Sequence, residues 1–227
     1  MTPVAQLTAQ QYAALPDDGR CTELVRGRIV EVPRPTSAHG YFCANVAGIL
    51  GGYVKANDLG RAVSNRCGVQ TERDPDTVRG PDVAFYSFDR IPRGPKPPGY
   101  WPAPELVFEV RSPSNSWPSV SAKATEYLNA GVKVVCVLDP DTAGIGVYTP
   151  DEFPRRLTTD EELALPEVFP DFRVPVREFL GSPGRHSATG GSPPARVVSA
   201  ASAAAVVVVR RNRRLPSPSA TFAPPEW

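Results

Sequence analysis

The chain has 227 residues, of which 41% are hydrophobic and 22% are charged, with a formal net charge of +1. This length predicts one domain, or one domain with an appendage, that buries a core without disulfides, and the balanced charge disfavours a protein that coats nucleic acid by charge alone. No stretch approaches the ~20 apolar residues of a membrane span, and the N-terminal residues lack the basic and apolar regions of a signal peptide, so we expect a cytoplasmic protein with no membrane partner.

The first half of the chain is predicted to alternate short helices and strands. Thr8 and Gln11 fit a capping box, and Arg26–Gly27 lies between two short strand patterns as a hairpin turn. The expected elements are a helix over 9–15, strands over 22–25 and 28–32, a helix from a Ser37 cap to about Asn57, and one strand over 62–71.

The second half has the pattern of a mixed α/β domain. The expected elements are strands over 81–87 and 106–111, a helix over 119–130, a strand over 132–138, and outer strands over 145–148 and 156–158. Residues 132–138 are almost all apolar, which is typical of a central strand covered on both faces. The strand–helix–strand unit over 106–138 is expected to be a right-handed crossover between parallel strands.

The last part of the chain differs in composition from the rest. Residues 181–227 hold six arginines and one acidic residue, whereas residues 1–180 hold 19 basic and 23 acidic residues and so carry a charge of −4. The last part is rich in Ser, Ala and Pro and lacks an amphipathic period. We therefore predict a folded domain over 1–182 and a low-complexity tail without fixed structure over 183–227.

Cysteine and histidine usage limits the kinds of site that the sequence can form. The four cysteines are far apart and form no C-x-x-C pair, which argues against a zinc cage and favours reduced, structural thiols. Only two histidines occur, His39 and His186, so sites built from several histidines are excluded.

Three residues point to hydrolytic chemistry. Asp82 opens a predicted strand, Glu109 interrupts an apolar one, and Lys123 lies in the following helix. Two carboxylates at adjacent strand ends, with a main-chain carbonyl and waters, can hold Mg²⁺, and a nearby lysine can orient the attacking water. The spacing alone leaves open a simple ion pair for Glu109 and an ordinary exposed position for Lys123, and Arg111 stands where an E-x-K pattern has lysine.

The order of several longer stretches is more specific. TELVRGRIVEVP, TVRGPDVAFYS, PELVFEVRSPSNS, KATEYLNAGVKVVCVLDP and LPEVFPDFRVPVREFL together resemble the Uma-two family of restriction-endonuclease-like proteins, within the PD-(D/E)XK nuclease superfamily. The resemblance covers about residues 7–180. It implies a restriction-endonuclease-like αβββαβ core, with a mixed central sheet flanked by helices, and a metal-dependent hydrolytic site.

The resemblance also implies roles for single residues. Asp82 and Glu109 match the metal-binding acids of the family, and Lys123 matches its helical lysine, a migrated form of the catalytic charge. Arg111 is a planar cation that cannot deprotonate, so we assign it a contact with the substrate phosphate rather than water activation.

Two further positions match the family near the start of the chain. Glu23 is expected to be an additional metal ligand, with a hairpin ion pair to Arg28 as the alternative. His39 heads the long predicted helix and is expected to contact a substrate phosphate there, with a capping or packed histidine as the alternative.

These matches predict an endonuclease that uses Mg²⁺ or Mn²⁺ to hydrolyse phosphodiester bonds in DNA. The alternative is a catalytically degenerate nucleic-acid-binding module on the same fold, which Arg111 and the negative charge of residues 1–180 favour. A third interpretation is an assembly protein that pairs through outer strands, and a homodimer is possible on any of the three.

Overall fold

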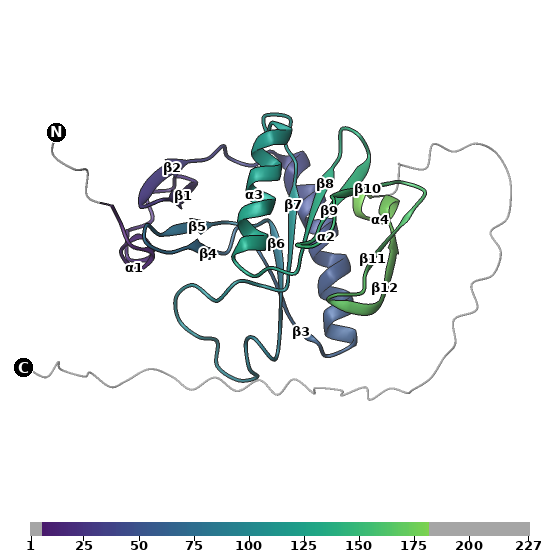
Figure 1. Cartoon of the computed structure of the whole chain (residues 1–227), viewed down its shortest axis with the longest axis horizontal. Helices are drawn as coiled ribbons and strands as arrows, with labels where there is room; N and C mark the ends of the chain where they lie inside the picture. Colours follow the sequence, from purple (N-terminus) through teal and green to yellow (C-terminus); the bar gives the residue numbers. More distant parts are fainter. Residues whose placement is uncertain (1–5, 182–227) are drawn as a thin grey trace, which may run out of the picture. The chain divides into compact units, whose positions relative to one another are not determined.

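The computed structural model describes residues 6–181, which form one α/β unit of three sheets and four helices (Figure 1). The helices of this part are α1 (Ala9–Ala13), α2 (Ser37–Ala56), α3 (Trp117–Asn129) and α4 (Val176–Leu180). The main sheet has the strand order β10 (Arg155–Thr158), β9 (Gly144–Tyr148), β8 (Val134–Asp139), β7 (Leu106–Val110), β6 (Val83–Ser87) and β3 (Gly60–Ser64). A smaller sheet has the order β2 (Arg28–Glu31), β1 (Thr22–Val25), β5 (Thr77–Arg79) and β4 (Val69–Glu72), and β11 (Glu162–Leu165) pairs with β12 (Phe169–Pro175).

The main sheet is mixed, as the sequence predicts. β7 and β8 are parallel and are connected through α3, whereas the other neighbouring pairs of this sheet are antiparallel. Every residue of β8 is buried, which confirms its expected place as a central strand. Antiparallel β9 and β10 complete one side of the sheet, as expected for outer strands.

Helices cover both faces of the main sheet. On one face, α2 packs Val46 and Leu50 against Phe108 of β7, and β12 and α4 extend this core. On the other face, α3 packs Tyr127 against Val107 of β7. Because successive side chains of a strand alternate between faces, Glu109 shares the α3 face with Val107.

Local signals near the N-terminus are confirmed. Thr8 and Gln11 form both hydrogen bonds of the capping box at the start of α1. β1 and β2 form the predicted hairpin, and both turn residues have positive φ, 48° at Arg26 and 73° at Gly27. These angles suit a tight turn of the primed type, whose twist matches the flanking strands.

The single strand expected over 62–71 is wrong. The chain forms β3 and β4 there, which belong to different sheets. Asn65 and Arg66 both adopt positive φ, 67° and 55°, and turn the backbone between the two strands. β4 then pairs with β5, a short strand that the sequence analysis did not predict.

Three other differences concern element ends and the C-terminal part of the unit. Thr36, not Ser37, caps α2 through a hydrogen bond from the His39 amide, and Ser116 caps α3, which begins two residues before the predicted start. The sequence analysis predicted no elements for the segment that forms β11, β12 and α4. The proposed tail over 183–227 lies outside the described residues, so the domain boundary at residue 182 stays a prediction.

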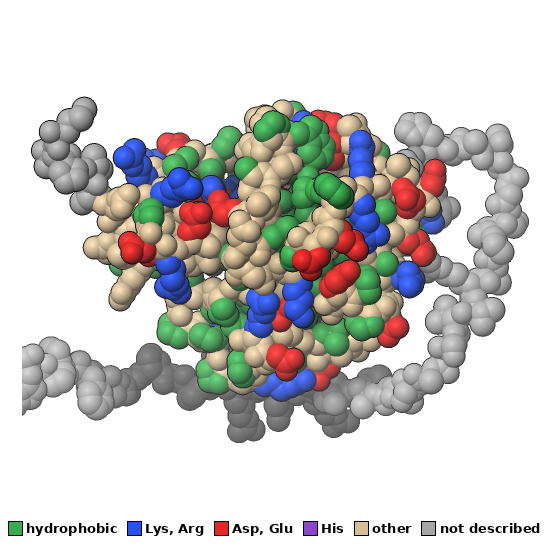
Figure 2. Space-filling model, in the orientation of Figure 1, with side chains coloured by type: hydrophobic (Ala, Val, Ile, Leu, Met, Phe, Trp, Pro, Cys, Tyr) green, Lys and Arg blue, Asp and Glu red, His purple; other side chains and the backbone are tan. Residues whose placement is uncertain are grey.

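Charged side chains of both signs lie on the surface of the unit. Acidic and basic side chains are interspersed on the face shown in Figure 2. Among residues 6–181, no helix combines the length and apolarity needed to cross a bilayer.

Candidate active site

The two predicted metal-binding acids meet at one end of the main sheet. Val83 pairs with Phe108 in the antiparallel ladder of β6 and β7. One further step of this register brings Asp82 to the end of β7 beside Glu109, where its Oδ2 accepts the Val110 amide at 2.8 Å. The expected convergence of these carboxylates therefore follows from strand pairing.

The helix α3 brings Lys123 into contact with Glu109 and Glu23. The Lys123 ammonium Nζ lies 2.9 Å from Oε1 of Glu109 and 3.3 Å from Oε1 of Glu23. One turn later, the buried Tyr127 hydroxyl donates to the same Oε1 of Glu109 at 2.9 Å. Residues four apart share one face of a helix, which explains why both side chains reach one carboxylate.

Burial and charge set the protonation tendencies of these groups. Burial raises the pKa of Glu109, the charge of Asp82 raises it further, and Lys123 and Tyr127 oppose this shift. Burial also acts to lower the pKa of Lys123, but Glu109 and Glu23 outweigh it and raise that pKa above its ordinary value. The ammonium therefore keeps its charge at neutral pH.

Each of the two acids presents one oxygen that the surrounding protein leaves open. Oδ2 of Asp82 accepts the Val110 amide at 2.8 Å, and Oε1 of Glu109 accepts from Lys123 and Tyr127. In the part of the chain that the structure describes, Oδ1 of Asp82 and Oε2 of Glu109 accept no hydrogen bond. Two carboxylate oxygens at one strand edge are donors of the type that Mg²⁺ and Mn²⁺ prefer.

Glu23 lies beside this pair but is held by several donors. Its Oε1 accepts the Gly80 amide at 3.1 Å and faces Lys123, and its Oε2 accepts from Arg79 at 3.0 Å. The backbone at Gly80 also packs closely against Arg66. A Cβ at residue 80 would lie 3.0 Å from the Cβ of Arg66, so the absence of a side chain allows this packing. Burial acts to raise the pKa of Glu23, but Lys123, Gly80 and Arg79 together lower it. The nearby cations are Arg66, Arg79 and Lys123 rather than the Arg28 of the hairpin alternative.

His39 lies in the first turn of α2 and faces Asp82. Its Nε2 is 3.1 Å from the carbonyl oxygen of Val110 and 3.3 Å from Oδ2 of Asp82, and its Nδ1 is 3.3 Å from Sγ of Cys43. The hydrogen bond with Asp82, followed by the contact with Cys43, raises the pKa of His39 to about 10. With no metal ion on Asp82, this pair favours the protonated imidazole.

Arg111 does not join the group formed by Asp82, Glu109 and Lys123. Its guanidinium lies 3.0 Å from both Asp139 and Asp141 and 5.3 Å from the centre of the Trp117 ring. Two carboxylates therefore neutralise this cation at the end of β7.

Sequence reasoning missed three members of the site. They are Tyr127, which is also buried in the core, Arg79 and Glu126, and the sequence analysis assigns none of them a role. Arg79 joins Glu23 to Glu126 through contacts of 3.0 and 2.6 Å. The one available signal was the spacing of Lys123, Glu126 and Tyr127, which lie within a single turn of the predicted helix.

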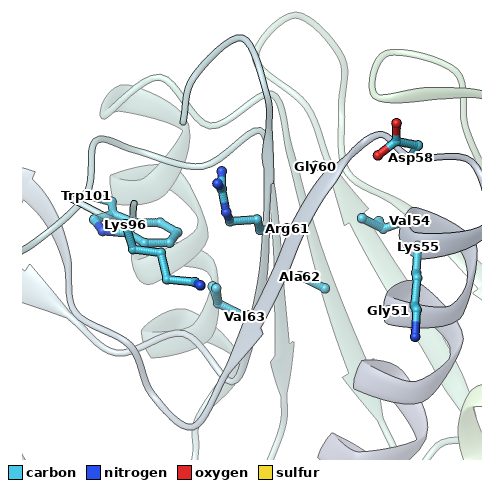
Figure 3. Close-up of a pocket in the computed structure, with 10 residues that line it drawn as sticks. All are labelled: Gly51, Val54, Lys55, Asp58, Gly60, Arg61, Ala62, Val63, Lys96 and Trp101. Carbon is cyan, nitrogen blue, oxygen red and sulfur yellow. The ribbon is translucent and has the colours of Figure 1, made fainter. Parts of the chain in front are cut away.

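A separate pocket of about 540 Å³ lies along β3 and contains none of these residues (Figure 3). It is formed by the C-terminal half of α2, the edge strand β3, and Lys96 and Trp101 from the loop between β6 and β7. The acidic site is thus at a strand end, away from this pocket.

Comparisons with known proteins agree with this arrangement. The model of the Uma2 family, described as "Putative restriction endonuclease", matches residues 9–177. The crystal structure of a "putative nuclease belonging to DUF820" from Anabaena variabilis matches with a TM-score of 0.68 and 21% sequence identity, covering 77% of this chain and 97% of that chain. At this identity the match shows a shared fold. No curated protein matches the chain.

Proposed function

This chain belongs to the Uma2 family, and from that membership and the geometry of the site we propose that it is a metal-dependent endonuclease that hydrolyses phosphodiester bonds in DNA. The observation that carries the proposal is the meeting of Glu109 with Lys123 at 2.9 Å, beside Asp82, at one strand edge. A carboxylate pair with a charged lysine is the set of groups that phosphodiester hydrolysis requires.

Asp82 and Glu109 are the residues that would hold the metal ion, Mg²⁺ or Mn²⁺. Their open oxygens, Oδ1 and Oε2, fit a hard cation that prefers oxygen ligands. Such an ion would polarise the phosphodiester and lower the pKa of a bound water.

Lys123 supplies the fixed positive charge of the site. Its ammonium carries donors that can orient the attacking water and stabilise the negative charge that develops on the phosphate. Glu109 and Glu23 hold Nζ from two sides, so the charge is placed before substrate binds. We assign Tyr127 the matching task of orienting Glu109 through its hydroxyl.

His39, Arg111 and Glu23 fit their predicted roles to different degrees. His39 fits a phosphate contact because it is cationic and lies in the first turn of α2, where helix amides also favour anions. Arg111 fits this role less well, because its guanidinium pairs with Asp139 and Asp141, outside the group formed by Asp82, Glu109 and Lys123. Glu23 fits an anchor for Lys123 better than a metal ligand, because donors already engage both of its oxygens.

The test is DNA cleavage by the full-length chain. Supercoiled, linear and single-stranded DNA are incubated with Mg²⁺, Mn²⁺ or EDTA, using the wild type and the variants Asp82→Asn and Lys123→Ala. We expect metal-dependent cleavage that falls by about 10²–10³-fold in Lys123→Ala, the typical effect of removing one preorganised donor. Lys133→Ala changes an exposed lysine just after α3 and should cleave like the wild type.

Other outcomes would change the assignment. Cleavage that survives Lys123→Ala but is lost in Arg111→Ala would move the cationic role to Arg111. An absence of cleavage with every DNA, together with no calorimetric binding of Mn²⁺, would contradict the proposal and support the binding-module alternative.

A further inference from the structure

A second group of metal-ligating side chains adjoins the proposed active site on its α2 side. His39 and Cys43 are one turn apart on α2, and Asp82 precedes β6. One donor atom from each residue can be chosen so that all three lie within 4.8 Å of one another. The group thus combines nitrogen, sulfur and oxygen donors from two elements that are distant in sequence.

The surroundings favour ligand binding over free solvation. The side chains of Asp82 and His39 are only 7% and 15% exposed, and Cys43 is partly buried. The α2 core underlies the group, since Cys43 packs against the buried cluster that includes Val46. Side chains in such a setting lose little additional freedom when they bind an ion, while partial exposure leaves room for a water ligand.

The three donors lie close enough for one ion after a side-chain rotation. With metal–nitrogen and metal–oxygen bonds of about 2.0 Å and metal–sulfur bonds of about 2.3 Å, neighbouring donors lie about 3.3–3.6 Å apart. The His39–Asp82 and His39–Cys43 contacts are both 3.3 Å, although they use different ring nitrogens. One ion takes one of these nitrogens, so rotation of the Cys43 or His39 side chain completes the set.

The donor types select the metal. Thiolate and imidazole suit Zn²⁺ and Co²⁺, whereas Mg²⁺ prefers oxygen ligands alone. Three protein ligands with a water in the fourth position is a common arrangement for zinc. The group therefore discriminates between thiophilic ions and the ion proposed for Asp82 and Glu109.

We propose that His39, Cys43 and Asp82 form a site for a thiophilic divalent ion such as Zn²⁺, which inhibits cleavage by engaging Asp82. Binding releases the thiol proton of Cys43 and one proton of the His39 imidazolium to solvent, because the ligands are a thiolate and a neutral imidazole. The inhibitory consequence rests on the proposed function, because it requires Asp82 to serve the Mg²⁺ or Mn²⁺ site. The binding itself does not, because it depends only on the three donors.

The direct test is a titration of the full-length chain with Co²⁺ as a spectroscopic probe. We expect a thiolate-to-cobalt charge-transfer absorption that Zn²⁺ abolishes by competition. Cys43→Ser should remove this absorption and weaken Zn²⁺ binding by more than about tenfold, the lower end of what losing even an outer-shell partner costs. Cys21→Ser changes a partly buried cysteine outside the group and should bind like the wild type.

A second measurement connects the site to activity. Zn²⁺ added to Mg²⁺-supported cleavage should inhibit the wild type at concentrations at least tenfold lower than those that inhibit Cys43→Ser. Co²⁺ binding without the charge-transfer absorption, or an absorption that persists in Cys43→Ser, would overturn the zinc site while leaving the nuclease proposal intact. If the zinc site forms but no metal supports cleavage, this inference is supported and the proposed function is contradicted.

Discussion

Glu109 shows how stability and chemistry use the same contacts. A lone carboxylate in an apolar strand is costly to bury, and the sequence left open an ion pair as the reason for its presence. The structure forms that ion pair with Lys123, the residue that the family resemblance implies is catalytic. The two interpretations therefore coincide, because the lysine that neutralises the buried acid also places the positive charge of the site.

Tyr127→Phe tests the orientation of this acid. The change keeps the ring in the core and removes only the hydroxyl that donates to Glu109. Because this hydrogen bond lowers the pKa of Glu109, its loss should move the acidic limb of the pH–rate profile to higher pH and reduce kcat by about tenfold or more. Reduced thermal stability with an unchanged pH profile would show that the hydroxyl serves packing alone.

His39 predicts a pH dependence of stability. Its pKa is raised from 6.5 to about 10, so the stabilisation from its protonated form is complete below about pH 6.5 and is lost as pH rises towards 10. Urea unfolding in EDTA should show the free energy of unfolding of the wild type falling over this range. His39→Gln should fall less over the same range, and equal losses in both proteins would contradict the assignment.

At the scale of elements, the small sheet acts as a support for α3. Glu23 of β1 binds Arg79 of β5, and Arg79 binds Glu126 of α3 at 2.6 Å. Glu23 also reaches Lys123 on the same helix. Three elements from separate parts of the sequence are thereby linked by charge, and their register fixes where the Lys123 ammonium lies.

The start of α2 offers a matched pair of capping variants. Thr36 accepts the His39 amide at 3.2 Å, whereas the exposed Ser37 lies inside the helix. We expect Thr36→Ala to lower the free energy of unfolding by about 1 kcal/mol and Ser37→Ala to leave it nearly unchanged. Urea denaturation of both variants measures this difference, and a larger loss in Ser37→Ala would return the cap to the residue that the sequence predicts.

At the scale of the whole molecule, the residues of the proposed site come from four separate parts of the described chain. Asp82 and Glu109 come from the ends of β6 and β7 in the main sheet, Lys123 comes from α3, and His39 comes from α2. Residues 181–227 hold six arginines and one acidic residue, and their net positive charge offsets the charge of −4 on residues 1–180. The fold and the charge balance are therefore set by different parts of the sequence.

A chain of residues 1–182 tests this division. We expect it to keep the thermal unfolding midpoint of the full-length protein and its rate of DNA cleavage at moderate salt. A lower midpoint or rate would show that residues beyond 182 contribute to the domain or to substrate binding. The solution mass of both chains would also test whether the protein forms a homodimer.

The sequence by itself predicted the α/β class, the hairpin and the long helix, and the family resemblance added the three central residues of the proposed site. These depend on local signals: apolar periodicity, capping residues, turn dipeptides, and single charged residues within apolar strands. The same local signals failed over 62–71, because the choice of sheet is made by partners distant in the chain, β6 for β3 and β5 for β4.

Only the tertiary structure decided which side chains meet. Arg111 and Lys123 are both cations near Glu109 in the sequence, but strand pairing places Asp139 beside Arg111, and helix packing places Lys123 on Glu109. The approach of Cys43 and His39 to Asp82 likewise depends on packing α2 against the sheet. Charge pairing and metal ligation act over a few ångströms, and distances on that scale between remote residues are set by packing rather than by sequence spacing.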